Sequence, residues 1–551
     1  MARSRTHVAA EPPIRLGWQR ALVLALVTTG LFVAYLSVEL KQNYEPGFPL
    51  DDSWIHLTFA RNLARGWGFA YNQGEPVAGS TAPLWTFVLA FFHLFTRNAT
   101  AMVVIAKSLG AGLLFVSAVF AFRIAGRITG SRRFGLAAGL AVATLGPMGW
   151  AMMSGMEVTL SVALTLAGIY YYLRFRTGRL SMLAWVLFGL AAWARPESLL
   201  LAAFAALDSL LRRFIWKQQP AFWRGFGVWL AIVLGWLWFN YSLSRAFFPL
   251  TYLAKAGKTS LFNAIAMRSL PQLKGLLTNG APSYLAGFCI HIWRANPALC
   301  LLVPVGLVGL IRRRHDNGLL IPLVVLGYAP LIGLVSPSAG AAFQNGRYIG
   351  NVTALAAIVA VIGCAYVWRW IRQPGLRIGL TAILLAMGVF NTVTVTVATV
   401  RNTTRAESSI NRMEVALGHW LAGNAPAGAT IACNDIGAIG YFSDRHIFDL
   451  SGLVSKELIG VRQSRESFMA FLNYRKPDFL VIFPAEYAGL RDAPFLTVVA
   501  YAEDKDNTAA LVDFQPRPKT IAGLLTLDLV VQPFPVTMVV YKCNRDLLPP
   551  R

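Results

Sequence analysis

The stretch ALVLALVTTGLFVAYLSVEL, which spans residues 21–40, decides the fold class. It contains one charged residue, Glu39, near its end. About 20 apolar residues in a helix are enough to cross the hydrocarbon core of a bilayer. The stretch is too long for the apolar part of a secretory signal, and no cleavage site of small residues follows it. We therefore expect an uncleaved first membrane span.

Similar stretches recur along the chain up to about residue 400. Hydrophobic residues make up 56% of the 551 residues and charged residues only 14%, whereas about a quarter of an ordinary soluble protein is charged. This composition argues against a soluble protein and favours a polytopic α-helical membrane protein. We predict about eleven spans, near residues 19–40, 100–122, 134–153, 157–173, 180–194, 198–215, 226–243, 296–311, 318–336, 348–368 and 378–399.

The basic residues predict how the spans are oriented. The formal net charge of +24 is compatible with nucleic-acid binding, but the charges cluster in short breaks between apolar stretches. Clusters of Lys and Arg beside spans mark the cytoplasmic side of a membrane. We therefore expect a multi-pass plasma-membrane protein with a cytoplasmic N-terminus, and no nucleic acid among its partners. The clusters lie at residues 123–133, 174–179, 212–224, 312–314 and 369–377.

This orientation divides the chain into two predicted domains. Residues 1–400 form the transmembrane domain, whose first outer loop covers residues 41–98; the apolar stretch 83–95 in this loop lies along the membrane or dips into it. Residues 401–551 lie outside the cytoplasm, where alternating helix and strand patterns predict a compact extracytoplasmic α/β domain. Its predicted elements are helices at 412–421 and 464–474 and strands at 429–433, 447–450 and 479–483.

The most informative polar residues lie in the segment PLDDSWIH, at residues 49–56 of the first outer loop. Asp51 and Asp52 stand at the start of a predicted amphipathic helix. Either can be the N-cap of that helix, but two adjacent carboxylates exceed what a cap needs. His56 follows Asp52 by four residues, so the two side chains can share a helix face and pair. A carboxylate at this position can also act as a general base.

This loop resembles the first-loop pattern of GT-C membrane glycosyltransferases. The resemblance rests on residues 51–55 (DDSWI), 60–63 (ARNL), 66–72 (GWGFAYN) and 75–85 (EPVAGSTAPLW). The pattern is most similar to that of the mycobacterial terminal arabinofuranosyltransferases, and further matches follow in order over nearly the whole chain. They are residues 154–157 (SGME), 194–198 (ARPES), 249–255 (PLTYLAK), 346–348 (GRY), 435–441 (DIGAIGY) and 449–453 (DLSGL). Departures from the pattern, which leave the donor sugar and the acceptor open, are Ser53, Trp54, Ser80, Ala82 and Leu250.

The resemblance implies a GT-C-like glycosyltransferase that takes a sugar, such as the pentofuranose arabinofuranose, from a polyprenyl-phosphate donor. The implied acceptor is a glycan, lipid or protein of the cell envelope, at the outer face of a bacterial plasma (inner) membrane. Such a transfer needs a base for the acceptor hydroxyl and cations for the charge that grows on the phosphate. We predict Asp52 or Asp51 as the base, and Lys255 and Arg347 as the phosphate-binding cations.

Further residues are predicted to bind substrate or donor, and these are His56, Glu157, Arg195, Glu197 and Tyr348. The predicted topology independently puts the acidic and basic candidates at outer ends of spans or in outer loops. Alternatives remain open for several of them. Glu157 can instead offset a helix dipole, and Arg347 can be an ordinary loop charge. Arg195 and Glu197 can simply pair with each other, beside the helix break that Pro196 imposes.

The sequence requires no cofactor. The five cysteines form no CxxC or Cys/His cluster, so we predict no metal site, although the two carboxylates and His56 could ligate a divalent cation. The second function considered is a transporter or flippase of a lipid-linked saccharide, and the third is a non-catalytic scaffold in envelope assembly. Related halves and charges spread through the membrane depth are typical of transporters, and the sequence has neither.

Overall fold

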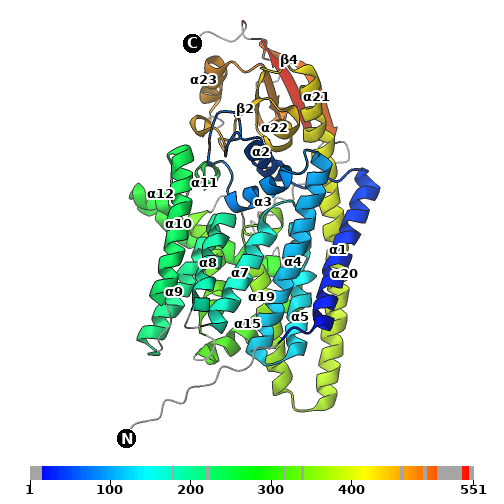
Figure 1. The fold of residues 1–551 in the computed structure, drawn as a ribbon, viewed down its shortest axis with the longest axis vertical. Coiled ribbons are helices and arrows are strands. Elements are labelled where there is room, and N and C mark those ends of the chain that lie inside the picture. Colours follow the sequence, from blue (N-terminus) through cyan, green and yellow to red (C-terminus); the bar gives the residue numbers. More distant parts are fainter. Residues whose placement is uncertain are drawn as a thin grey trace.

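A computed structural model gives the arrangement of the chain in space. It describes residues 15–175, 179–217, 222–256, 259–314, 318–336, 340–459, 464–487, 490, 493–504, 536–544 and 546. Figure 1 shows an elongated molecule in which a bundle of helices carries a smaller domain with a β-sheet at one end.

The helices of the bundle run roughly along the long axis of the molecule (Figure 1). Each predicted span coincides with a helix, except that residues 134–153 form two helices bent by 55° at a short break. The bundle helices are α1 (Trp18–Asn43), α4 (Ala99–Thr129), α5 (Arg132–Ala143), α6 (Gly146–Met153), α7 (Val158–Arg174), α8 (Arg179–Ala194), α9 (Leu199–Phe214), α10 (Phe222–Ser244), α14 (Ala281–Ala295), α15 (Pro297–Arg312), α17 (Leu320–Val335), α19 (Gly350–Trp370) and α20 (Pro374–Ile410).

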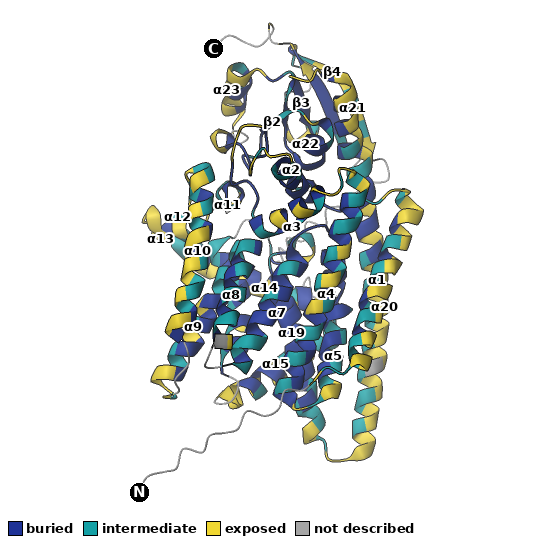
Figure 2. Cartoon of the chain, in the orientation of Figure 1, coloured by how far each residue is buried: buried dark blue, intermediate teal, exposed yellow. Residues whose placement is uncertain are grey.

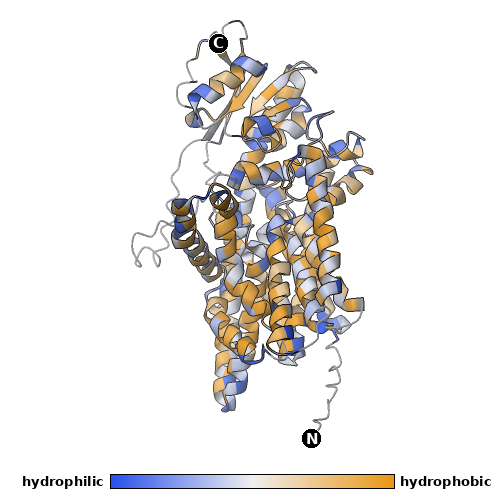
Figure 3. Ribbon diagram, turned by 90° about the vertical axis from the view of Figure 1, so that its left-hand side faces the viewer, coloured by the Kyte–Doolittle hydropathy of each residue, from blue (hydrophilic) through white to orange (hydrophobic). Residues whose placement is uncertain are grey.

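Burial separates helices that face lipid from helices inside the bundle. In α19, 83% of the most apolar window is buried, whereas in α1 and α10 only 17% is. Figure 2 shows this contrast between the dark α19 and the largely yellow outer face of α20, and Figure 3 shows that hydrophobic residues cover the bundle along its length. Apolar side chains that stay exposed on outer helices are typical of contact with lipid rather than water. The chain therefore is a helical membrane protein.

The number of spans stays a prediction. Within the described residues, five helices are long and apolar enough to cross a membrane, or six if the bent pair α5–α6 counts as one span. The shorter apolar helices include α3 (Pro83–His93), α7, α8, α15 and α17. A helix of 16 residues, such as α15, is about 24 Å long at 1.5 Å per residue, which is less than the roughly 30 Å of the hydrocarbon core.

Short helices and turns form the end of the bundle that faces the small domain. Helix α8 stops at Ala194 because Pro196 cannot continue it, as predicted, and the chain makes one turn of 3-10 helix, η1 (Pro196–Ser198), before α9. The other elements here are α2 (Asp52–Ala64), α3, α11 (Leu250–Ala256), α12 (Leu261–Ala266), α13 (Leu270–Gly275), η2 (Leu276–Gly280) and α18 (Phe343–Gly346).

The C-terminal domain is built on a five-stranded mixed sheet of order β2-β1-β3-β5-β4. Strands β1 (Thr430–Cys433), β2 (His446–Asp449) and β3 (Phe479–Ile482) are parallel, and β5 (Val536–Cys543) joins β3 to β4 (Leu496–Asp504) by antiparallel pairing. The predicted strands and helices of this region are confirmed, the helices as α21 (Ala416–Asn424) and α23 (Arg465–Arg475). The sequence analysis did not foresee β4, β5, α22 (Gly437–Ser443), η4 (Lys456–Leu458) or η6 (Pro484–Glu486).

The C-terminal domain packs directly against the first outer loop. Helix α20 continues past the predicted boundary at residue 400, and η3 (Asn411–Val415) joins it to α21. One hydrophobic core contains Ile55 and Phe59 of the first outer loop together with Ile431 and Ile439 of the domain. Because this core is shared, the domain and the first outer loop hold each other in place.

Candidate active site

A cavity of about 170 Å³ lies where the first outer loop, the adjoining ends of the bundle helices and the C-terminal domain meet. Eight of the nine predicted site residues line it, and only Asp51 does not. They come from segments that are far apart in the chain. They are Asp52, His56, Glu157, Arg195, Glu197, Lys255, Arg347 and Tyr348.

Asp52, at the start of α2, faces two cations. Its Oδ2 lies 2.8 Å from Arg347 Nη1 and 3.5 Å from Lys255 Nζ. Burial raises the pKa of the Asp52 carboxyl, but Lys255 and Arg347 outweigh burial and hold the pKa well below its ordinary value. About a quarter of the Asp52 side chain (26%) remains exposed, so a molecule in the cavity can reach it.

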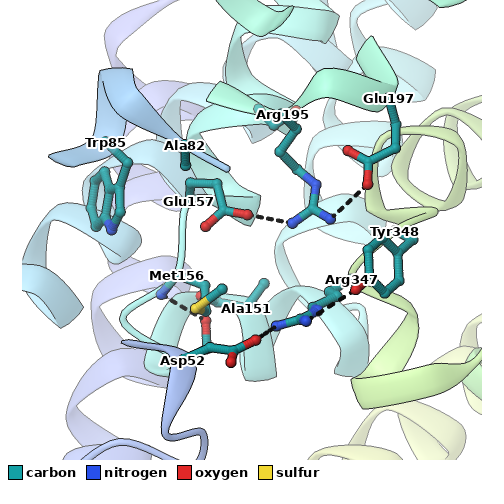
Figure 4. A network of polar contacts seen from close by, with 12 residues as sticks. Asp52, Ala82, Trp85, Ala151, Met156, Glu157, Arg195, Glu197, Arg347 and Tyr348 are labelled. Carbon is teal, nitrogen blue, oxygen red and sulfur yellow. Dashed lines mark hydrogen bonds and ion pairs between the residues drawn. The ribbon is translucent and has the colours of Figure 1, made fainter. Parts of the chain in front are cut away.

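A strained turn presents Arg347 and Tyr348 to the cavity. Gln344, Asn345 and Gly346 before them all have positive φ angles, of 46°, 55° and 73°. A side chain on Gly346 would also meet His291, because an added Cβ would lie 2.6 Å from the imidazole Cε1. Glycine tolerates both the backbone conformation and the close approach. Arg347 then donates to Asp52 and, at 3.1 Å, to the Tyr348 hydroxyl (Figure 4).

Glu157 and Arg195 form a second, more buried ion pair. Arg195 Nη1 donates to Glu157 Oε1, and Glu157 Oε2 lies 3.3 Å from His56 Nε2. Glu157 is the N-cap residue of α7 and makes no side-chain cap hydrogen bond to it; its carboxylate contacts Arg195 and His56 in the cavity wall. The other imidazole nitrogen of His56 lies 3.1 Å from Ser80 Oγ. The imidazole of His56 therefore contacts Glu157 and Ser80, and not Asp52, with which its spacing would also allow it to pair.

Tyr348 connects the two ion pairs. The Arg195 guanidinium lies over its ring at 5.2 Å and the Arg347 guanidinium at 5.0 Å. Arg195 Nη2 also pairs with Glu197 Oε1 at 3.4 Å, as Figure 4 shows. Because buried guanidinium groups next to carboxylates and an aromatic ring are held in one orientation, the polar wall of the cavity is preorganised.

Asp51, unlike the other predicted site residues, does not line the cavity. Its Oδ2 accepts a hydrogen bond from Gly437 N at 2.6 Å and its Oδ1 accepts one from Ala438 N at 2.7 Å. Asp51 thus caps α22 of the C-terminal domain and makes no cap to its own helix. Burial raises the pKa of Asp51 to about 6 against these two hydrogen bonds, which lower it. Both oxygens of Asp51 therefore bind the backbone, and its side chain is not among those that line the cavity.

The C-terminal domain contributes directly to the cavity through Leu453. Asp449 holds this loop, because its carboxylate accepts hydrogen bonds from Ser451 N and Val454 N, both at 2.8 Å. Val454 and Leu453 lie so close to Gly79 that an added Cβ there would come within 2.6 Å of Val454 Cγ1. The sequence analysis placed the segment 449–453 at the end of a predicted strand and within the resemblance, but did not predict Leu453 as a site residue.

Several lining residues were not predicted as site residues. The hydroxyl-bearing ones are Ser80, Thr81, Thr251 and Tyr252, and the apolar ones include Leu199, Leu200, Phe248, Phe262 and Val335. Ser80, Thr81, Thr251 and Tyr252 lie inside the segments 75–85 and 249–255 that carry the resemblance, so those segments were the available signal. The apolar residues look like ordinary membrane or core residues in sequence, and only folding shows that they share a cavity.

A metal ion has no evident place here. Within the described residues, no three His, Cys, Asp or Glu side chains come together in a way that could hold one. Asp52 and His56, which the sequence analysis considered as ligands, contact a pair of cations and Glu157 respectively.

Comparisons in sequence identify only part of the chain. Residues 401–520 match the model of a domain of unknown function (DUF8728). No curated protein matches the chain.

Comparisons of structure cover nearly all of it. ArnT from Cupriavidus metallidurans bound to undecaprenyl phosphate is similar with a TM-score of 0.57 and 11% identity, over 97% of this chain and all of that one (100%). The oligosaccharyltransferase of Archaeoglobus fulgidus tethered with an acceptor peptide is similar with a TM-score of 0.57 and 9% identity, over 84% of this chain and 68% of that one. AglB, from the same archaeon, in complex with an inhibitory peptide and a dolichol-phosphate has a TM-score of 0.57 and 11% identity, over 84% and 69%.

These likenesses define the class of fold. The chain shares its fold with ArnT and with the archaeal oligosaccharyltransferase. At identities of 9 to 11% a shared fold does not carry a shared function, so the function has to be argued from the cavity.

Proposed function

We propose that this protein is a glycosyltransferase that moves a sugar from a polyprenyl-phosphate donor to a hydroxyl group of an acceptor. The observation that carries this proposal is the contact of Asp52 with Arg347 and Lys255 in a cavity that also has an apolar side. A carboxylate beside two cations offers both a base and a phosphate-binding group.

In the proposed step, the acceptor oxygen forms a bond to the anomeric carbon of the sugar. The bond between that carbon and the phosphate oxygen breaks, and polyprenyl phosphate leaves with the bonding electrons. Asp52 takes the proton of the acceptor hydroxyl. Arg347 and Lys255 stabilise the negative charge that grows on the phosphate, which is the largest contribution that charged groups make to such a reaction.

The ion pairs of Asp52 also control its strength as a base. Without donor, the two cations lower the pKa of Asp52, and a carboxylate of low pKa is a weak base. A donor phosphate competes with Asp52 for the same two cations and adds negative charge next to it. Both effects raise the pKa of Asp52, so that donor binding prepares the base for the acceptor.

The apolar side of the cavity suits the first isoprene units of a lipid carrier. Leu199, Leu200, Phe248 and Val335 line it, together with Phe262 of α12, which is 54% exposed. A side chain that lines the cavity and also faces outward marks the route by which a chain leaves the cavity for the bilayer. The structures of ArnT with undecaprenyl phosphate and AglB with dolichol-phosphate support a carrier of this class.

The finer assignments rest on the sequence. The first-loop resemblance favours a pentofuranose such as arabinofuranose as the sugar, and a glycan, lipid or protein of the cell envelope as the acceptor. The basic clusters favour an active site at the outer face of a bacterial plasma membrane, with the C-terminal domain outside the cytoplasm and the N-terminus inside.

The test uses purified protein in lipid nanodiscs with a panel of radiolabelled polyprenyl-phosphate pentoses and hexoses. The expected result is release of free polyprenyl phosphate from one donor, with the label transferred to an envelope glycan fraction. Asp52→Asn serves as the control that keeps the fold. Movement of an intact donor across proteoliposome membranes without release of its carrier would overturn the proposal in favour of a transporter.

A further inference from the structure

Four residues that line the cavity each have a buried polar atom without a hydrogen-bond partner. The atoms are Thr251 Oγ1, Glu197 Oε2, Glu157 Oε2 and Arg347 Nε. Buried polar atoms in folded proteins are nearly always paired, and each exception asks for an explanation such as a missing ligand. Unpaired atoms also occur away from the cavity, for example Thr165 Oγ1 in α7. Of the four atoms in the cavity wall, Glu157 Oε2 lies 3.3 Å from His56 Nε2, and Arg347 already binds Asp52 and Tyr348 through its other nitrogens. Thr251 Oγ1 and Glu197 Oε2 are therefore the two that can accept a hydrogen bond from a molecule in the cavity.

The local backbone explains why the Thr251 hydroxyl is available. A threonine inside a helix usually donates to the carbonyl four residues before it, but α11 begins at Leu250, so Thr251 has no such helical carbonyl. Thr251 as a whole is only 6% exposed. The neighbouring Tyr252 hydroxyl donates to Val335 O at 2.8 Å, which fixes α11 against the end of α17.

Glu197 is held in place by one oxygen and leaves the other unused. Its Oε1 pairs with Arg195, and its side chain is 13% exposed. In Figure 4 the carboxylate lies close to Arg195 and above Tyr348. An ionised carboxylate oxygen is a strong acceptor for hydroxyl groups. Arg195 is meanwhile also bound by Glu157, so it is already paired with two carboxylates.

We propose that Glu197 and Thr251 form a subsite that binds ring hydroxyls of the donor sugar, an inference that rests on the proposed glycosyl transfer. Glu197 Oε2 accepts from one hydroxyl, and Thr251 Oγ1 exchanges a hydrogen bond with another. Leu453 of the C-terminal domain lies on the same cavity and gives the ring an apolar surface. The subsite takes a neutral sugar, because a sugar carboxylate next to Glu197 would be repelled.

The experiment separates binding of the sugar from binding of the carrier. Affinities of the protein in nanodiscs are measured for polyprenyl phosphate alone and for polyprenyl-phosphate arabinofuranose, mannose, glucose and glucuronate. The variants are Thr251→Val and Glu197→Gln, which keep the side-chain shapes. Thr165→Val is the matched control, since it removes an unpaired buried hydroxyl that is not among the residues lining the cavity.

Polyprenyl phosphate alone is expected to bind both variants within about twofold of wild type. The gain in affinity is the factor by which the best neutral sugar improves binding over polyprenyl phosphate alone. We expect this factor to fall about fivefold in Thr251→Val, which loses a neutral hydrogen bond. We expect it to fall tenfold or more in Glu197→Gln, which loses a hydrogen bond to a charged group. Thr165→Val keeps the gain, and glucuronate gives none.

Two outcomes would rule out the proposed subsite even if polyprenyl phosphate still binds. In the first, no sugar-bearing carrier binds wild type more tightly than polyprenyl phosphate alone. In the second, both variants keep the full gain in affinity from the sugar. Failure of wild type to bind polyprenyl phosphate at all overturns the proposed function itself, so the two failures are distinguishable.

Discussion

Asp51 and Asp52 are adjacent in the chain, yet their carboxylates bind different parts of the protein. Asp51 accepts two backbone N–H groups of α22 in the C-terminal domain, at 2.6 and 2.7 Å. Asp52 accepts from Arg347 at 2.8 Å inside the cavity. Because one peptide bond joins them, the residue proposed as base is fixed directly next to the contact that docks the C-terminal domain.

Replacement of Asp52 is expected to change turnover and carrier binding in opposite directions. In Asp52→Asn the acceptor hydroxyl loses its base, so turnover falls about 10²- to 10⁴-fold. Arg347 and Lys255 lose their internal counter-ion, so polyprenyl phosphate binds a few-fold more tightly than in wild type. Turnover is measured by carrier release and affinity by titration in nanodiscs. Weaker carrier binding in this variant would contradict the competition between Asp52 and the phosphate.

The two cations are expected to respond differently to exchange. Arg347 is buried and its planar fork reaches both Asp52 and Tyr348, so Arg347→Lys lowers the affinity for polyprenyl phosphate about tenfold. Lys255 is 39% exposed and its flexible side chain adapts, so Lys255→Arg stays within about threefold of wild type. Titration of both variants with the carrier tests this order. Equal losses would show that charge alone, and not the fork, binds the phosphate.

Asp51 is expected to make stability depend on pH. Burial raises its pKa from the ordinary 3.8 to about 6. Its contribution to stability is therefore fully present below pH 3.8 and is lost as the pH rises through 6. Wild type should thus lose part of its thermal stability between pH 4 and pH 7, and Asp51→Asn, which cannot titrate, should lose a few degrees less over the same range. Parallel melting profiles of the two proteins would refute this assignment.

Asp449 provides a comparison for the pH experiment. Its pKa is also raised to about 6 by burial, so Asp51→Asn is expected to flatten the profile only partly. The double variant Asp51→Asn with Asp449→Asn should be flatter than either single variant.

The close packing of Gly79 against Leu453 and Val454 of the C-terminal domain can be tested with two substitutions, of which the second compensates for the first. A Cβ at Gly79 would lie 2.6 Å from Val454 Cγ1 and 3.1 Å from Leu453 O, so Gly79→Ala is expected to push this loop away from the cavity and weaken donor binding about tenfold. The second change Val454→Ala removes the closest atom and should restore part of the affinity. The added Cβ would also lie 3.0 Å from Phe59 Cζ. No recovery in the double variant would therefore show that Phe59 or the loop backbone, rather than the Val454 side chain, fixes the spacing.

The sequence predicted which charged residues line the cavity better than it predicted which of them contact each other. Glu157 and Arg195 were expected near each other because both flank predicted spans on one side of the membrane, and they form an ion pair. Helical spacing allowed His56 to pair with Asp52, but the fold brings Glu157 to the imidazole. Spacing along one helix says nothing about the groups that arrive from other helices.

The amino-acid sequence by itself determined the membrane-embedded helical bundle, the α/β character of the last domain and the charged residues that line the cavity. The length of an apolar stretch, a cluster of basic residues and the alternation of helix and strand patterns are properties of short segments. Each can be recognised without knowing which other segments pack against it. Only the tertiary structure decided which of two adjacent aspartates faces the cavity, and that Leu453 reaches it from the C-terminal domain. Those features depend on packing between segments hundreds of residues apart, for which a single sequence carries no local pattern.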